Sequence, residues 1–250
     1  MKPAGRQAPT RLATPGAAPD GGAADRVVPD RVTPDHFVVA ARSLDDGIAW
    51  CEATLGVAPS AGGRHAMMGT HNVLLGLGSP RFPRTYLEIV AIDAAAASPS
   101  RPRWFDLDQP QLQRAIESGP RLVHWVARAG DLEATSAVWR AGGEDPGVVT
   151  SAERMSPRGL LRWRITLRAD GGRPCGGAVP LLIEWGGEHP GDALPASGVT
   201  IEDIRLGGVT TEFAAGVGAS AATAGPPSLT LVLATPLGRV VLASPAFAVA

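Results

Sequence analysis

The chain has 250 residues, which is enough for one or two compact domains with a sizeable core. Its formal net charge of −1 and pI near 6.5 exclude the basic surface that a nucleic-acid-binding protein needs. No apolar run approaches the roughly 18 residues of a membrane span, the N-terminus lacks the apolar centre of a secretory signal, and two cysteines cannot build a disulfide framework, so we expect a cytoplasmic protein.

Residues 1–30 form the first segment of the chain. They are rich in Pro, Gly and Ala and show no hydrophobic periodicity. Such a segment cannot bury enough apolar area to offset the entropy lost on ordering. We therefore expect a disordered leader before the first domain.

Residues 31–97 predict a first module of strands around one helix. Ser43 is a candidate N-cap with acidic residues after it, and Gly56 is placed to end the helix. There is room for a short strand between Pro59 and His65. The clear strands are expected at 36–40, 73–78 and 86–92.

Residues 121–192 repeat this order after a linker. The linker, residues 98–120, contains a short helical pattern near 111–117. The second module is expected to have a helix at 131–141 and strands at 122–127, 160–167 and 180–185. Residues 193–250 then resemble a shortened third copy, with segments at 199–208, 212–217, 229–233 and 239–242.

His and Glu recur at matching places in the two modules. His36 and His124 lie on the opening strands, and Glu88 and Glu184 lie on the closing strands. Two imidazoles and two carboxylates suit a divalent metal site if the modules pack face to face. The alternative is a coincidence of ordinary strand residues.

Strand alternation favours a cavity position for His36, because Phe37 and Val39 would face the helix. Buried carboxylates need a cation or a hydrogen-bond donor. The compensating group is either a metal ion or the pair Arg162 and Arg164, which alternation places on one face of their strand. Both alternatives remain open.

A second polar cluster lies in one Gly-flanked stretch and comprises Arg64, His65, His71 and Asn72. One interpretation is a loop whose histidines bond the backbone. The other is a polar mouth to the cavity, with His65 or His71 as acid or base and with Arg64 or Asn72 orienting a substrate oxygen. A metal held by His65 and His71 is a third alternative.

Several runs carry a resemblance to a known family. The segments DHFVVAARSLDDGIAWCEATLG and YLEIVAID, paired with HWVARAGDLEATSAVWRAGG and LLIEWGGEHP, resemble the vicinal oxygen chelate superfamily. The run GGRHAMMGTHNVLLGLG resembles its glyoxalase-like domain proteins. The similarity covers residues 32–190 well and 199–245 loosely. It implies an α+β fold of paired βαβββ modules, with a third partial module at the C-terminus and with metal ligands His36, Glu88, His124 and Glu184.

Two functions follow from the resemblance and the polar residues. The first is a lyase- or isomerase-type enzyme acting on a small oxygenated metabolite, with a Zn, Ni, Mn or Fe ion as Lewis acid. The second is a metal-free protein that binds or sequesters a small molecule. No nucleic-acid or membrane partner is expected, and a homodimer is allowed for. The predicted catalytic residues are Glu184, His71 and His65, and the predicted substrate-binding residues are Arg64, Asn72, Arg162 and Arg164.

Overall fold

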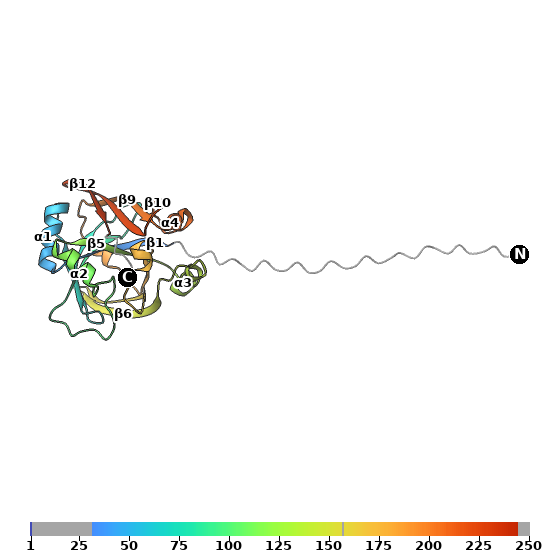
Figure 1. The fold of residues 1–250 in the computed structure, drawn as a ribbon, viewed down its shortest axis with the longest axis horizontal. Coiled ribbons are helices and arrows are strands. Elements are labelled where there is room, and N and C mark those ends of the chain that lie inside the picture. Colours follow the sequence, from blue (N-terminus) through green and yellow to red (C-terminus); the bar gives the residue numbers. More distant parts are fainter. Residues whose placement is uncertain (2–31, 157, 245–250) are drawn as a thin grey trace.

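The computed structural model describes Met1 and residues 32–156 and 158–244 (Figure 1). Apart from Met1, the expected leader at residues 1–30 lies outside the described residues. In the described part of the chain, no helix is long and apolar enough to cross a membrane.

Two βαβββ modules build one eight-stranded sheet. The first module consists of β1 (Thr33–Ala40), α1 (Leu44–Leu55), β2 (Ser60–His65), β3 (Thr70–Gly76) and β4 (Tyr86–Ile92). The second consists of β5 (Arg121–Arg128), α3 (Leu132–Ala141), β6 (Val148–Ser156), β7 (Gly159–Leu167) and β8 (Leu181–Trp185). Short 3-10 turns, η1 (Pro174–Gly177) and η2 (Pro190–Asp192), flank β8. The paired modules predicted from the sequence are therefore present.

The strands follow the order β2-β3-β4-β1-β5-β8-β7-β6. In each module the first strand pairs in parallel with the last, and β1 joins β5 antiparallel to connect the modules. The two edge strands β2 and β6 contact each other, so the sheet curls and encloses one of its faces. We call this enclosed face the inner face and the opposite one the outer face.

Local sequence determines where helix α1 begins and ends and how closely it packs on the sheet. The Ser43 side chain accepts a hydrogen bond from the backbone of Asp46, and Gly56 ends the helix in the left-handed conformation with φ 76°. Gly47 is buried, and a Cβ at this position would collide with Ile89 of β4. Glycine therefore lets α1 lie close against the outer face of the sheet.

The outer face carries the larger of two apolar cores. Phe37 and Trp125, from the two central strands, stack with ring centroids 5.9 Å apart. Helices α1 and α3 and a second, four-stranded sheet contribute to this core, and Figure 1 shows that sheet along one side of the domain.

The inner face is filled largely by the segment between the modules. Trp104 and Phe105 are buried here, and α2 (Pro110–Glu117) buries Leu112 and Ile116 against the same core. Phe105 takes a positive φ of 60°, which is uncommon for a bulky residue. The segment expected to be a linker is thus a structural part of the inner core.

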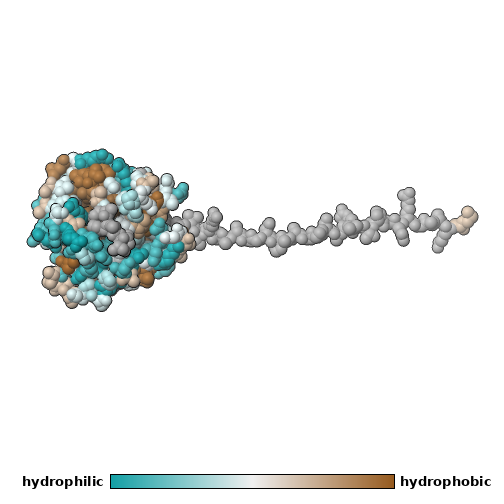
Figure 2. All heavy atoms as spheres, viewed as in Figure 1, coloured by the Kyte–Doolittle hydropathy of each residue, from teal (hydrophilic) through white to brown (hydrophobic). Residues whose placement is uncertain are grey.

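The C-terminal unit is a partial third module. Its elements are β9 (Thr200–Gly207), α4 (Thr211–Gly216), β10 (Ala221–Thr223), β11 (Ser228–Thr235) and β12 (Gly238–Ala243). The order of elements matches the modules, but the strand after the helix, β10, pairs in parallel with β9, giving the order β10-β9-β11-β12. Figure 2 shows apolar atoms gathered near β12, where Leu237 and Val241 are exposed.

Candidate functional site

Glu88 lies on β4 at the centre of the inner face and is buried. Nδ2 of Asn72 donates a hydrogen bond of 2.5 Å to its Oε1, and Nε2 of His65 is 3.9 Å from the same oxygen. Nε2 of His36 is 3.5 Å from Oε2. No Lys or Arg of the described residues lies within 4.0 Å of this carboxylate. The charge of Glu88 is therefore surrounded by imidazole and amide groups.

His36 is oriented by the residue before it. Its Nδ1 lies 2.7 Å from Oδ1 of Asp35. A carboxylate accepts hydrogen bonds, so Nδ1 carries the proton and Nε2 is directed towards Glu88. This arrangement is typical of imidazoles that transfer protons or bind ligands through Nε2.

Asp35 connects this imidazole to the second module. Its Oδ2 lies 2.8 Å from Nε2 of His189, 3.2 Å from Nε1 of Trp185 and 3.4 Å from Nη1 of Arg128. Burial would raise the pKa of Asp35, but the hydrogen bonds with His189 and His36 outweigh it and hold that pKa well below its usual range. Asp35 is therefore an ionised anchor fully inside the protein.

His65 is held neutral by its surroundings. Its Nδ1 lies 3.1 Å from Oγ1 of Thr70, and Trp104 and Trp163 meet its ring edge-to-face at 5.0 and 6.2 Å. Burial lowers the pKa of His65 to about 4, although Glu88 acts in the opposite direction. At neutral pH this imidazole carries no charge.

A small cavity of about 20 Å³ lies beside His36 and Glu88. This is about the space that one water molecule needs. The walls are mostly aromatic and come from both modules and the intervening segment: Tyr86, Trp104, Phe105, Trp163 and Trp185. Only a group of the size of a water molecule fits in this cavity as it stands.

Arg154 also lines the cavity and was not anticipated from the sequence. It lies on β6, a strand that the sequence pattern did not reveal, and it is only 8% exposed. Among the described residues, no carboxylate lies within 4.0 Å of its guanidinium, and its hydrogen bond to the backbone oxygen of Met155 is long at 3.4 Å. A buried cation without an acidic partner is a strong sign of a binding function.

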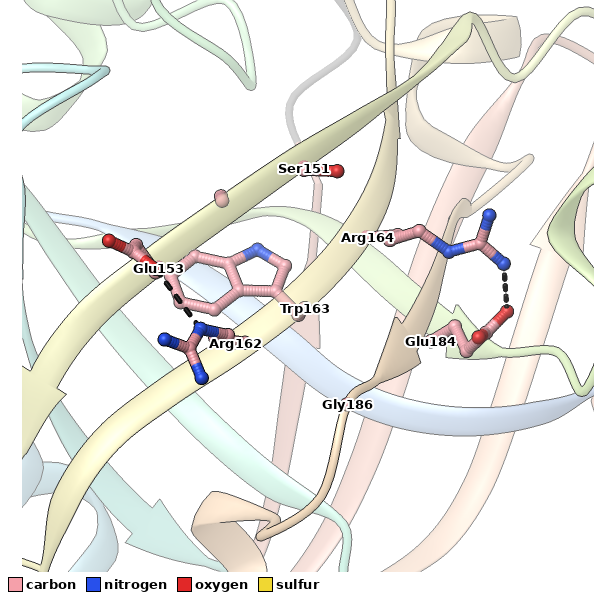
Figure 3. Close-up of a pocket in the computed structure, with 8 residues that line it drawn as sticks. Ser151, Glu153, Arg162, Trp163, Arg164, Glu184 and Gly186 are labelled. Carbon is pink, nitrogen blue, oxygen red and sulfur yellow. Dashed lines mark hydrogen bonds and ion pairs between the residues drawn. The ribbon is translucent and has the colours of Figure 1, made fainter.

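Glu184, predicted as both metal ligand and catalytic residue, is not in this site. Its carboxylate accepts a hydrogen bond of 2.6 Å from Arg164 on the outer face (Figure 3). Val38 pairs with Glu88 in the first module, whereas the corresponding Val126 pairs with Leu181 in the second. Glu184 lies three positions beyond Leu181, and an odd offset places a side chain on the opposite face of a strand.

The predicted substrate-binding arginines also lie elsewhere. Nε of Arg162 is 3.2 Å from Glu153, and Arg164 additionally contacts Glu133 at 2.7 Å. Both arginines line an open groove of about 420 Å³ on the outer face (Figure 3). They therefore do not compensate Glu88, and the pairing of Arg164 with Glu184 is a local contact of the second module.

The stretch around His65 and His71 is a β-hairpin rather than a loop. Arg64 pairs across the strands with His71, and His65 pairs with Thr70. Alternation sends His65 and Asn72 to the inner face, whereas Arg64 forms an ion pair with Asp93. The structure thus brings together two of the four predicted residues, and places Arg64 and His71 outside the inner cluster.

His124 lies near the site but not in it. Val38 pairs with His124 and Val39 with Leu122, so a β-bulge at this point turns the imidazole towards Phe105, with ring centroids 5.5 Å apart. Neither ring nitrogen has a hydrogen-bond partner among the described residues. Burial, aided by Arg173, lowers the pKa of His124 well below its usual value.

The four predicted metal ligands therefore do not converge. His36 and Glu88 are adjacent, but His124 faces Phe105 and Glu184 is on the outer face. Within residues 32–156 and 158–244, no group of three or more His, Cys, Asp or Glu side chains could hold a metal ion. The donor arrangement of this chain does not fit the predicted metal centre.

Comparison with solved structures gives distant similarities. A hypothetical protein from Staphylococcus aureus has 14% identity and a TM-score of 0.44, with 70% of this chain and 69% of that chain covered. Methylmalonyl-CoA epimerase from Mycobacterium tuberculosis has 20% identity, TM-score 0.36 and coverage of 62% and 89%. A variant of the Streptomyces coelicolor methylmalonyl-CoA epimerase in complex with 2-nitronate-propionyl-CoA has 18% identity, TM-score 0.41 and coverage of 64% and 98%. These similarities identify no activity for this chain.

Comparison with family models identifies the family of the chain. A search of curated proteins gives no match. The model of the glyoxalase-like domain matches residues 35–221, which include both βαβββ modules and the start of the third unit. The chain therefore belongs to the glyoxalase-like domain family.

Proposed function

We propose that this protein is an isomerase- or lyase-type enzyme that moves a proton on a small oxygenated metabolite, with Glu88 and His36 as the catalytic residues. The observation that carries the proposal is the position of Glu88. Its carboxylate lies beside a cavity, is held by Asn72, and has no Lys or Arg within 4.0 Å among the described residues. Such a carboxylate is suited to accept a proton.

The proton transfer uses side chains that the fold has already positioned. Oε2 of Glu88 accepts a proton from a carbon next to a carbonyl group, and the electron pair of the C–H bond shifts towards the carbonyl oxygen. His36, oriented through Nδ1 by Asp35, exchanges a proton with the substrate through Nε2. When that carbon carries a hydroxyl group, His36 moves the hydroxyl proton to the former carbonyl oxygen through Nε2, and Glu88 returns its proton to the former carbonyl carbon. This exchange completes an isomerisation without any change of oxidation state in the protein.

The proposed chemistry does not pass through a metal ion. Members of the vicinal oxygen chelate superfamily, which the sequence resembles, commonly bind divalent metal ions. In this chain, however, the His124 ring packs against Phe105, and Glu184 pairs with Arg164 on the outer face. The proposed steps therefore rest on the imidazole and carboxylate groups alone.

The alternative is a metal-free protein that binds or sequesters a small molecule. A groove of about 310 Å³ lined by Leu74, Leu161 and Leu194 favours this second function, because its apolar walls can contact an apolar ligand. Binding of a ligand without any exchange of its protons would support it.

Solvent exchange tests the enzymatic proposal. The protein is incubated in D₂O with a panel of small ketones, aldehydes and oxo acids, and deuterium incorporation is followed by NMR. We expect exchange at the carbon next to the carbonyl, and a rate lower by roughly 10²- to 10⁴-fold in Glu88→Gln. Glu184→Gln is the matched control, since this carboxylate lies on the outer face. No exchange by the wild type, or equal exchange by Glu88→Gln, would contradict the proposal.

A further inference from the structure

Arg154 lines two neighbouring cavities. It lines the small cavity beside Glu88, and it also lines a larger groove of about 310 Å³ between the edge strand β2 and the turn after β8. The groove has apolar walls at Leu74, Leu161 and Leu194. The guanidinium therefore stands where the groove meets the catalytic cavity.

The surrounding chain leaves space for this guanidinium. The side chain crosses from β6 towards β2, and a Cβ at Gly63 would lie 2.5 Å from its Nη1. Gly63 is part of a β-bulge between Ala61 and Arg64, and its backbone N–H donates a hydrogen bond of 2.7 Å to Asn72. One bulge thus positions the amide that holds Glu88 and admits the guanidinium of Arg154.

Among the described residues, the guanidinium of Arg154 has no acidic partner within 4.0 Å. A desolvated cation is costly unless an anion compensates it. Glu188 is the one acidic side chain among the described residues of the groove lining, and it is exposed and forms no ion pair with Arg154 within 4.0 Å. Glu88 shares the small cavity with Arg154, but its carboxylate does not lie within 4.0 Å of the guanidinium either. The positive charge of Arg154 is therefore free to pair with an anionic ligand.

We infer that Arg154 is a specificity-determining residue that binds the carboxylate of the substrate, and that the substrate is a small carboxylate with an apolar chain. The planar guanidinium fork matches a carboxylate with two parallel hydrogen bonds. The apolar chain would lie along the groove, and the group next to the carboxylate would then reach Glu88. This inference rests on the proposed function for the reaction, but the binding itself can be measured separately.

Calorimetric titration with hexanoate, and with hexanamide as the neutral analogue, tests the inference. The wild-type protein should bind hexanoate more tightly than hexanamide. Arg154→Gln should weaken hexanoate binding by roughly 10- to 100-fold, because a hydrogen bond to a charged group contributes about 1.5–3 kcal/mol, and should leave hexanamide binding unchanged. Arg239→Gln is the matched control, since Arg239 is exposed on β12 and paired with Glu202.

Gly63→Ala provides a second variant if Arg154→Gln folds poorly. The added methyl group would displace the end of the flexible Arg154 side chain without removing its charge, so hexanoate binding should weaken while the melting temperature changes little. Equal affinity of the wild type for hexanoate and hexanamide would overturn the inference, as would wild-type hexanoate affinity in Arg154→Gln.

The two proposals fail in different ways. Tight, Arg154-dependent binding of hexanoate without deuterium exchange in any oxo acid would overturn the enzymatic function and leave the carboxylate site standing. Deuterium exchange that is equally fast for neutral ketones and for oxo acids would overturn the carboxylate site and leave the enzymatic function standing.

Discussion

Asn72 holds Glu88 through a hydrogen bond of 2.5 Å from Nδ2 to Oε1, while its own Oδ1 accepts a bond of 2.7 Å from the backbone N–H of Gly63. The amide is therefore fixed at both ends, and it links a bulge in the edge strand β2 to the central carboxylate of the inner face. The two partners also fix which end of the Asn72 amide faces Glu88. The carboxylate only accepts hydrogen bonds, and the Gly63 N–H only donates one.

Replacing this amide should cost stability as well as activity. In Asn72→Ala, the Gly63 N–H and the Glu88 carboxylate both lose a partner inside the protein, and each buried polar group left without one costs about 1–3 kcal/mol. We expect the free energy of unfolding, measured with urea, to fall by at least about 1 kcal/mol. An unchanged midpoint would show that water replaces the amide without loss.

The stability of the protein should depend on pH through His65. Its folded pKa of about 4 lies below the ordinary value of 6.5, so the unfolded chain binds a proton that the folded chain does not between these two pH values. The free energy of unfolding should therefore be unaffected by His65 above pH 6.5. It should fall as the pH drops towards 4, by up to about 3 kcal/mol. His65→Gln should flatten this slope, with His71→Gln as the control for losing an imidazole from the same hairpin. Equal slopes in the two variants would contradict the assignment.

His124 should be dispensable for folding. Its imidazole has no hydrogen-bond partner among the described residues and is fully buried. His124→Leu removes this unsatisfied group at similar volume, so we expect an increase in stability of about 1 kcal/mol, larger at pH 5 than at pH 8. Melting temperatures with and without added Zn, Ni, Mn or Fe provide the measurement. If the metal ions stabilise the wild type and not the variant, His124 is a metal ligand after all.

Glu184→Gln should have a small effect. The Arg164 and Glu184 side chains are 39% and 33% exposed, and exposed ion pairs contribute at most about 1 kcal/mol. We expect a loss below this value in urea unfolding, and unchanged deuterium exchange. A loss of several kcal/mol would mean that the pair organises the outer face of the second module.

Local patterns predicted the elements well where caps and alternation were clear. Ser43 and Gly56 bound α1 as expected, Asp131 caps α3, and Leu161, Trp163 and Ile165 face the inner core while Arg162 and Arg164 face outward. Strand β6 was missed because its central residues, Ser151 to Arg154, have no alternation of apolar and polar side chains. The same omission hid Arg154.

The candidate site was only partly predictable, for a physical reason. His36, Glu88, His65 and Asn72 were identified by residue type, and the structure brings them together. Glu184 was misplaced because a repeat in sequence does not specify strand register, and a three-residue offset reverses the face of a side chain. Asp35 could have been identified from its place directly before His36 at the start of a strand, but its contact with His189 depends on tertiary packing.

The first and last strands pair in a different register in the two modules, and this difference determines how many ligands one chain binds. A duplicated scaffold offers two equivalent halves, but the position that carries Glu88 in the first half is occupied by Leu181 in the second. The second half therefore supplies walls and the anchoring partners of Asp35, and its described residues add no carboxylate to the lining of the small cavity. One chain should consequently saturate with a single equivalent of ligand, so that the duplication yields one asymmetric compartment in place of two.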